Sequence, residues 1–237
     1  MYEMTNTSRG WGMFAAQAEA SERAEFIKKT YLHLGGAVLS FVGIEAVLLN
    51  MPGIENLAMS MFRAWWVVML AFIAVSWIAE KWANSAVSLQ TQYLGLGLYV
   101  VAEAVIFAPM LYFAQKIGGP DIIPTAGIIT GIIFGGLTGV VLMTGSDFSF
   151  LRTALSLAMF AALGVAVCSS LFGFQLGILY VVAMIVVAGG YILYDTSNVM
   201  HHYRIGQHVA ASLALFASVA LLFWYVVQLV LRYSSDD

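Results

Sequence analysis

Residues 153–194 read TALSLAMFAALGVAVCSSLFGFQLGILYVVAMIVVAGGYILY, a stretch of 42 residues without a charged side chain. One helix needs about 20 apolar residues to cross the hydrocarbon core of a bilayer, so this stretch is too long for a single crossing. Gly173-Phe174-Gln175 interrupts it near the middle, and glycine commonly ends a helix. The stretch therefore predicts a tight hairpin of two transmembrane helices.

Similar apolar runs on both sides extend this pattern to seven predicted spans. They lie near Tyr31–Asn50, Ser60–Ile78, Tyr93–Ala114, Ile122–Thr144, Phe150–Leu171, Leu176–Tyr194 and Val209–Leu231. The second is the weakest, because it starts beside Arg63, which must reach the membrane surface or find a buried partner. The fold class predicted is an all-α membrane protein, a compact seven-transmembrane-helix bundle.

The composition excludes several other classes of protein. Of the 237 residues, 61% are hydrophobic and 10% are charged, whereas soluble domains carry about a quarter charged residues. The formal net charge is −3 and the ten basic residues form no dense cluster, which gives no support for nucleic-acid binding. Cys168 is alone, so it cannot form a disulfide within the chain. The partner that the composition predicts is a lipid bilayer.

The polar residues predict the domain organisation and the orientation. Residues 1–30 form a polar, helical leader, residues 31–232 the seven-helix domain, and residues 233–237 a short tail. With the N-terminus in the cytoplasm, that side holds Arg9, Arg23, Lys28, Lys29, Lys81, Arg152 and Arg204, and the other side holds Arg63, Lys116 and Arg232. Basic residues favour the cytoplasmic side, so we expect a cytoplasmic N-terminus and an external C-terminus.

Glycines repeat every four residues along the fourth run. Gly127, Gly131, Gly135 and Gly139 would place a smooth stripe on one helix face, where the backbone of a neighbouring helix can approach. Frequent glycine is normal in membrane helices, but it explains the regular spacing poorly. The stripe predicts close helix packing.

Ionisable side chains within the runs are candidate functional residues, because a charge at bilayer depth is costly unless paired or hydrated. Glu45 lies close to the end of the first run, which favours an interfacial position. Glu103 lies in the middle of the third run, where a structural polar contact and a functional carboxylate are equally consistent. Asp195 ends the sixth run, where the helix dipole disfavours a carboxylate, so we expect a partner or a longer helix.

The sequence offers little support for an enzyme and none for a cofactor. No HExxH, GxSxG or Walker-type pattern occurs, and no lysine in the seventh run could carry a retinal Schiff base. The four histidines are better explained as solvated or capping residues. We therefore predict no catalytic residues.

Three segments carry a family resemblance. Gly189-Gly190-Tyr191-Ile192-Leu193-Tyr194-Asp195-Thr196-Ser197-Asn198 resembles the sixth-helix signature of the Bax inhibitor family, also called the transmembrane Bax inhibitor motif family. Phe26–Tyr31 is similar to the family's entry to the first helix, and Asp147-Phe148-Ser149-Phe150-Leu151 to its link between the fourth and fifth. The region of Glu103 and Pro109 resembles its third helix more loosely. The short tails resemble bacterial members, which implies the inner membrane.

The resemblance implies a seven-helix bundle whose last helix is central. It also implies a pH-sensitive calcium leak, gated by two carboxylates that share a proton and separate on ionisation. Asp195 matches the first of these. The second is expected on the last helix, but aligning Leu215-Phe216-Ala217 with the family pattern places Ser218 at that position. A serine can make one hydrogen bond to Asp195 but cannot share a proton with it.

Two hypotheses follow from the sequence. In the first, the chain is a cation leak with a calcium-linked or proton-linked gate at Asp195 and Ser218, with Glu103 and Arg63 as further candidates; Asp195 is then a weak calcium ligand, and no firm metal site is predicted. In the second, the chain is a regulatory membrane protein that binds a membrane-anchored AAA protease or a stress-response partner, through its first 30 residues.

Overall fold

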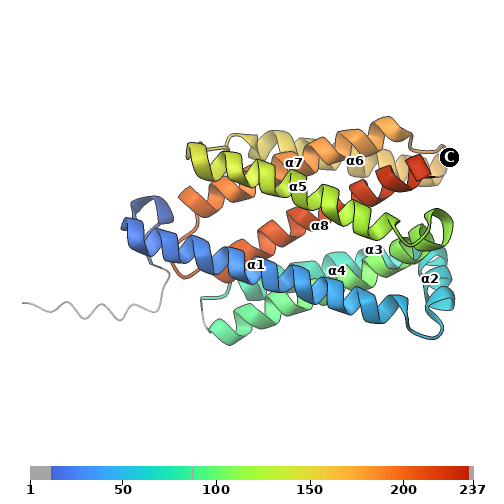
Figure 1. Cartoon of the computed structure of the whole chain (residues 1–237), viewed down its shortest axis with the longest axis horizontal. Helices are drawn as coiled ribbons and strands as arrows, with labels where there is room; N and C mark the ends of the chain where they lie inside the picture. Colours follow the sequence, from blue (N-terminus) through green and yellow to red (C-terminus); the bar gives the residue numbers. More distant parts are fainter. Residues whose placement is uncertain (1–11, 87, 235–237) are drawn as a thin grey trace, which may run out of the picture.

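The computed structural model describes residues 12–86 and 88–234, most of which are helical. In chain order the helices are η1 (Ala15–Gln17), α1 (Ala20–Leu49), α2 (Ile54–Arg63), α3 (Trp65–Ala83), α4 (Leu89–Gly118), α5 (Ile122–Thr144), α6 (Leu151–Phe172), α7 (Ile178–His201) and α8 (His208–Ser234). Seven of them, α1 and α3 to α8, are long and apolar enough to cross a membrane. They lie side by side, with α1 beginning at one end of the bundle and the C-terminus at the other (Figure 1). The predicted all-α seven-helix class is confirmed.

The first span is longer than its apolar run. Helix α1 begins at Ala20, eleven residues before the predicted start at Tyr31, so the later part of the expected leader is helical and continues directly into the membrane. Residues 1–11 of the leader and residues 235–237 of the tail lie outside the described residues. The cellular orientation stays a prediction.

The second membrane span starts at a different residue from the one predicted. A break at Ala64, where φ is −109° and ψ is 31°, separates the short helix α2 from α3. Helix α2 follows a turn at Gly53, whose φ of +88° suits glycine, and it packs against α4 through Ile54 and Ala58. The predicted run Ser60–Ile78 crossed this break, because no proline or glycine marks Ala64.

The predicted hairpin at Gly173 is confirmed. Helix α6 ends at Phe172, Gly173 has a φ of +72°, and α7 begins at Ile178. The positive φ lets the chain leave the helix, and the Gly173 N–H donates to the Ser169 carbonyl at 2.9 Å, as in a glycine-terminated helix. Helices α6 and α7 therefore run side by side in opposite directions, and α7 returns towards the end at which α1 begins.

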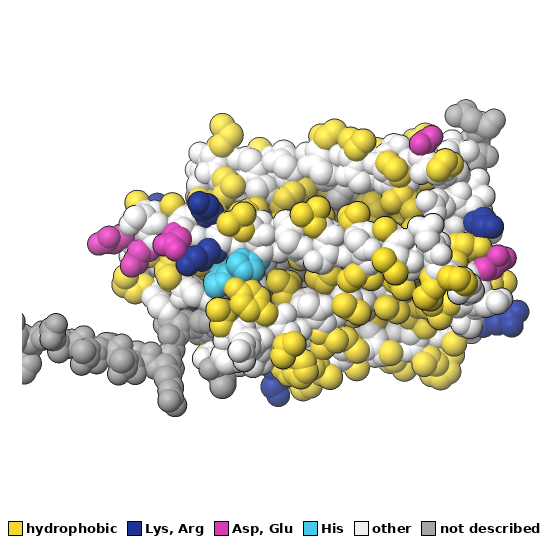
Figure 2. Space-filling view, turned by 60° about the horizontal axis from the view of Figure 1, so that its bottom comes forward, with side chains coloured by type: hydrophobic (Ala, Val, Ile, Leu, Met, Phe, Trp, Pro, Cys, Tyr) yellow, Lys and Arg dark blue, Asp and Glu magenta, His cyan; other side chains and the backbone are white. Residues whose placement is uncertain are grey.

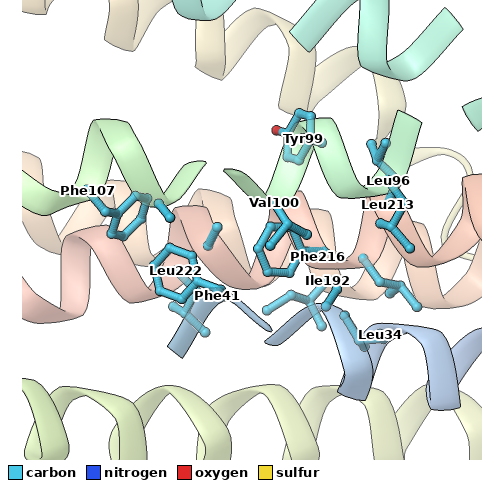
Figure 3. Close-up of a cluster of buried hydrophobic side chains, with 14 of the residues drawn as sticks. Leu34, Phe41, Leu96, Tyr99, Val100, Phe107, Ile192, Leu213, Phe216 and Leu222 are labelled. Carbon is cyan, nitrogen blue, oxygen red and sulfur yellow. The ribbon is translucent and has the colours of Figure 1, made fainter. Parts of the chain in front are cut away.

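Helix α8 is the centre of the bundle. It packs against α1, α3, α4, α5 and α7, whereas α6 packs only against α7 among the well-defined helix pairs. In Figure 3 the side chains of Leu34, Tyr99, Phe107 and Ile192 point towards α8 from three different helices. Several of its apolar residues, including Leu215, Leu222 and Val226, are fully buried. The central last helix implied by the family resemblance is confirmed.

The closest helix approach occurs at a glycine outside the predicted stripe. A Cβ atom at Gly95 of α4 would lie 2.5 Å from the Ala83 nitrogen of α3, so only glycine permits this approach. At Gly127, Gly131, Gly135 and Gly139 a Cβ atom would meet nothing within 4 Å. The structure does not place this stripe against another helix of the chain, because the neighbours of α5, mainly α7 and α8, pack on its other residues.

Candidate functional site

A cavity of about 450 Å³ lies between α4, α7 and α8, with Phe72 of α3 and Met159 of α6 completing its wall. Apolar side chains form most of the lining. The polar lining consists of Tyr99, Glu103, Tyr191, Asp195, Ser218 and Tyr225. The cavity therefore brings together three of the four side chains that the sequence predicted for an ion pathway.

Asp195 of α7 and Ser218 of α8 face each other in this cavity. The Ser218 hydroxyl donates a hydrogen bond to Asp195 Oδ2 at 2.5 Å, and the two residues are only 5% and 8% exposed, for Ser218 and Asp195 respectively. Helix α7 continues for six residues beyond Asp195 to His201, so the carboxylate is inside the helix and has a partner. The structure thus brings together the two positions that the family resemblance paired.

Glu103 contributes a second carboxyl group to the same cavity, from the middle of α4. It is 7% exposed, and a side-chain hydrogen bond joins it to Tyr99, one helical turn earlier. The sequence left a structural contact and a functional carboxylate equally open for this residue. The second carboxyl group of this cavity thus comes from α4, and not from α8.

Arg63 does not belong to this cavity. It ends α2, is exposed, and lines a separate surface depression with Glu55 and Ser60. Helix α2 lies at one end of the bundle, whereas Asp195 is in the last turns of α7, which end at the other (Figure 1). Arg63 and Asp195, both candidates for the ion pathway, therefore lie apart, because Arg63 is the last residue of the surface helix α2.

An aromatic cluster borders the cavity beyond Glu103. The rings of Phe107 and Trp224 both line the cavity and lie 4.9 Å apart, and Phe107 stacks on Phe223 at 5.9 Å. Phe41 of α1 meets Phe107 edge-on at 5.2 Å and also contacts Phe216 and Phe223. Phe41 and Phe107 are buried, as Figure 3 shows. This cluster therefore separates the cavity from the part of the bundle on the far side of these rings.

Glu45 is buried beyond this cluster, one helical turn after Phe41 on α1. It is 5% exposed, and neither carboxyl oxygen has a hydrogen-bond partner. The interfacial depth favoured by the sequence stays a prediction, whereas the burial of the side chain within the bundle was not expected. Position along the run gave the depth of this residue but not its direction, and Glu45 lies on the buried face that also carries Leu34, Ala37 and Phe41.

The loop between α7 and α8 pairs with residues 12–17 in the neighbourhood of Asp195. The Ala15 N–H donates to the Tyr203 carbonyl at 2.8 Å, the Ile205 N–H donates to the Met13 carbonyl at 2.9 Å, and the Phe14 ring lies under the Arg204 guanidinium. Burial raises the pKa of the Tyr203 hydroxyl, and the nearby Asp195 carboxylate adds to this rise. Sequence reasoning missed this contact, because it joins segments almost 190 residues apart.

Asp147 connects the loop between α5 and α6 to the end of α7. Its Oδ1 accepts hydrogen bonds from the Ser149 N–H at 2.8 Å and from the Ser197 hydroxyl at 3.1 Å, and His202 Nε2 lies 3.2 Å from its Oδ2. The backbone hydrogen bond from Ser149, together with the other donors, lowers the pKa of Asp147 to about 2. Asp147 therefore ties this loop to α7 only two residues beyond Asp195, through Ser197.

Comparisons with known proteins agree with this architecture. Residues 23–236 match the family model described as "Inhibitor of apoptosis-promoting Bax1". An uncharacterized protein of Pseudomonas aeruginosa is 27% identical over 226 residues, which cover 94% of this chain and 96% of the relative. An uncharacterized membrane protein of Vibrio cholerae is 25% identical over 174 residues, or 72% of this chain and 76% of the relative. The chain is a multi-pass membrane protein and belongs to the Bax inhibitor family.

Proposed function

We propose that this protein is a cation leak in which Asp195 and Glu103 supply the negative charge of the pathway. The observation that carries the proposal is the cavity between α4, α7 and α8, which both carboxyl groups line together with the Ser218 hydroxyl. Membership of the Bax inhibitor family supports it. The family pattern expects the second acid on the last helix, and here Glu103 takes that role from α4.

The lining suits transient binding of a cation. Calcium prefers six to eight oxygen ligands, and two carboxylates with a few hydroxyl groups supply only part of such a shell. Among residues 12–86 and 88–234, no three His, Cys, Asp or Glu side chains lie close enough to hold one metal ion. A weakly held ion keeps some of its water and can leave again, which conduction requires.

We infer that the pathway is closed in this arrangement of the helices. On one side of the cavity the rings of Phe41, Phe107 and Phe223 form a dry constriction, and such constrictions block ions because water does not enter them. In the neighbourhood of Asp195 lies Tyr203 with the residue 12–17 segment. Opening requires movement of α8 in this mechanism, because α8 packs against both α4 and α7.

Calcium flux into vesicles tests the proposal. The full chain is reconstituted into liposomes that contain a calcium dye, and the initial rate is measured for the wild type, Asp195→Asn and Glu103→Gln. Loss of one charge in a site of low polarity is expected to lower the rate about tenfold or more in each variant. Glu45→Gln is the matched control, since it removes a buried carboxyl group outside the cavity and should leave the rate unchanged.

Two results would overturn the proposal. One is a wild-type rate equal to that of protein-free liposomes. The other is an Asp195→Asn rate equal to the wild-type rate. Size-exclusion elution and helical content of each variant are measured first, so that a misfolded variant is not counted as an inactive one.

A further inference from the structure

A second hollow runs along the outside of the bundle, between α1 and α4. It has a volume of about 530 Å³, and we call it the α1/α4 groove. Its lining is apolar except for three side chains, His33 and Ser40 of α1 and Tyr93 of α4. The groove is separate from the cavity that holds Asp195, with which it shares no lining residue.

The length of the α1/α4 groove matches one leaflet of a bilayer. On α1 its lining extends from Leu32 and His33 to Ile44. Eleven residues of helix rise about 16 Å at 1.5 Å per residue. Half of a hydrocarbon core about 30 Å thick is nearly the same distance. An acyl chain that enters at His33 would therefore reach the middle of the bilayer near Ile44.

Two glycines keep the groove open. Gly36 of α1 and Gly97 of α4 both line it, and a Cβ atom at either position would meet nothing within 4 Å. Side chains could be added at these positions without a clash inside the protein, and they would then occupy the groove. The free space belongs to the groove and is not needed for contact between the two helices.

The titratable side chains of the groove lie at one end. His33 Nδ1 lies 2.7 Å from the Lys29 carbonyl oxygen, so this nitrogen carries a proton, and His33 Nε2 lies 3.0 Å from the Tyr93 hydroxyl. The His208 ring of α8 lies 4.9 Å from the His33 ring. Figure 2 shows histidine side chains at one end of this face, with Lys or Arg side chains beside them and hydrophobic side chains beyond.

The Lys29 ammonium group is a cation that can exchange its ion-pair partner for another anion. Its ammonium group lies 2.7 Å from Glu25 in an exposed pair, with side-chain exposures of 51% and 65%. Exposed pairs of this spacing contribute little to helix stability, because solvent screens the two charges. A phosphate that is held in place by its own acyl chain can therefore replace Glu25 at little cost. Tyr93 is typical of the headgroup level, where tyrosine is enriched.

We propose that the α1/α4 groove is a specific site for an anionic phospholipid. One acyl chain lies over Gly36 and Gly97, and the phosphate group is bound by Lys29 with His33, Tyr93 and His208 around it. The lipid comes from the leaflet at which α1 begins. The inference is independent of ion conduction, because the site lies outside the cavity that the proposed function uses.

Competition between two lipids tests the site. The full chain in detergent is mixed with equal amounts of phosphatidylglycerol and phosphatidylcholine of the same acyl composition, and retained lipid is counted by native mass spectrometry. One phosphatidylglycerol molecule is expected to be retained about tenfold better than phosphatidylcholine. Lys29→Ala should weaken its retention about fivefold. Lys81→Ala is the control, since Lys81 lies over Trp77 on α3, away from the groove.

Filling the groove gives a second measurement. Gly36→Leu combined with Gly97→Leu should abolish retention of this lipid, whereas Gly43→Leu should not, because Gly43 is equally open on α1 but does not line the groove. Millimolar inorganic phosphate should not displace the lipid. Equal retention of the two lipids, displacement by phosphate, or a protein dimer that Gly36→Leu dissociates would overturn the proposal, and the dimer would identify a second copy as the occupant.

Discussion

Asp195 and Glu45 are both buried carboxyl groups within the membrane spans, yet their surroundings differ. Asp195 lines a cavity and accepts a hydrogen bond from Ser218. Glu45 lies beside the aromatic cluster of Phe41, and neither of its oxygens has a hydrogen-bond partner. Burial alone therefore does not identify a functional carboxylate. What distinguishes Asp195 is a donor within reach and space for an ion.

The largest expected effect comes from making the Asp195 site more acidic. Ser218→Asp places a second carboxylate within hydrogen-bond distance of Asp195, and two like charges in a buried site repel each other. We expect a loss of about 2–4 kcal/mol in unfolding free energy at neutral pH, and recovery at acidic pH as the pair becomes protonated. Thermal unfolding in detergent from pH 4 to pH 8 measures this.

Ser218→Asn separates charge from size in that experiment, because asparagine has nearly the same shape as aspartate. A loss that is equal for both variants and independent of pH would mean that the site responds to packing alone. Added calcium should restore stability to Ser218→Asp at neutral pH and leave Ser218→Asn unchanged.

A smaller effect of opposite sign is expected at Glu45. Glu45→Leu removes a buried polar group without partners, which should raise the unfolding free energy by about 1–2 kcal/mol. Asp195→Leu should instead lower it, since the Ser218 hydroxyl then loses its acceptor. Chemical unfolding of both variants in the same detergent compares their unfolding free energies. A lower unfolding free energy for Glu45→Leu would contradict this expectation and would show that Glu45 makes a stabilising interaction.

The smallest effect is expected at Asp147, a carboxylate with a side chain 45% exposed. Asp147→Asn should cost about 0.5–1 kcal/mol at neutral pH, because solvent screens an exposed group. The pKa of Asp147 is lowered from 3.8 to about 2, so its contribution is present above pH 4 and is lost as the pH falls towards 2. The stability difference between wild type and variant should shrink over that window, and a constant difference would contradict this assignment.

The fold could be predicted from the sequence where a residue that commonly ends a helix, such as glycine, interrupts the hydrophobic pattern. The uncharged stretch from Thr153 to Tyr194 required two helices, and Gly173 marked the turn between them. The break at Ala64 was missed because tryptophan and alanine continue the apolar pattern on its far side. A helix boundary of this kind depends on packing against α4 and not on local propensity.

The site was predictable in its residues but not in their grouping. The motif around Asp195 and the alignment of Ser218 gave one pair correctly in space. The sequence did not show whether Glu103 or Arg63 lines the same cavity as this pair. That depends on how each helix is rotated and on which helix carries each residue. For the same reason the burial of Glu45 was not predicted, since the depth of a residue in a span says nothing of the direction of its side chain.

The central place of α8 has a consequence for how this protein is made. The helix that fills the middle of the bundle is synthesised after the other six spans, since α8 begins at His208 and follows them all in chain order. Chains grow from the N-terminus at about 5–20 residues per second, so six spans enter the membrane before the segment that holds them together exists. Until then the inward faces of α1, α4 and α7 have only lipid or an insertion chaperone to contact. Final assembly of the bundle must therefore wait until α8 has been synthesised.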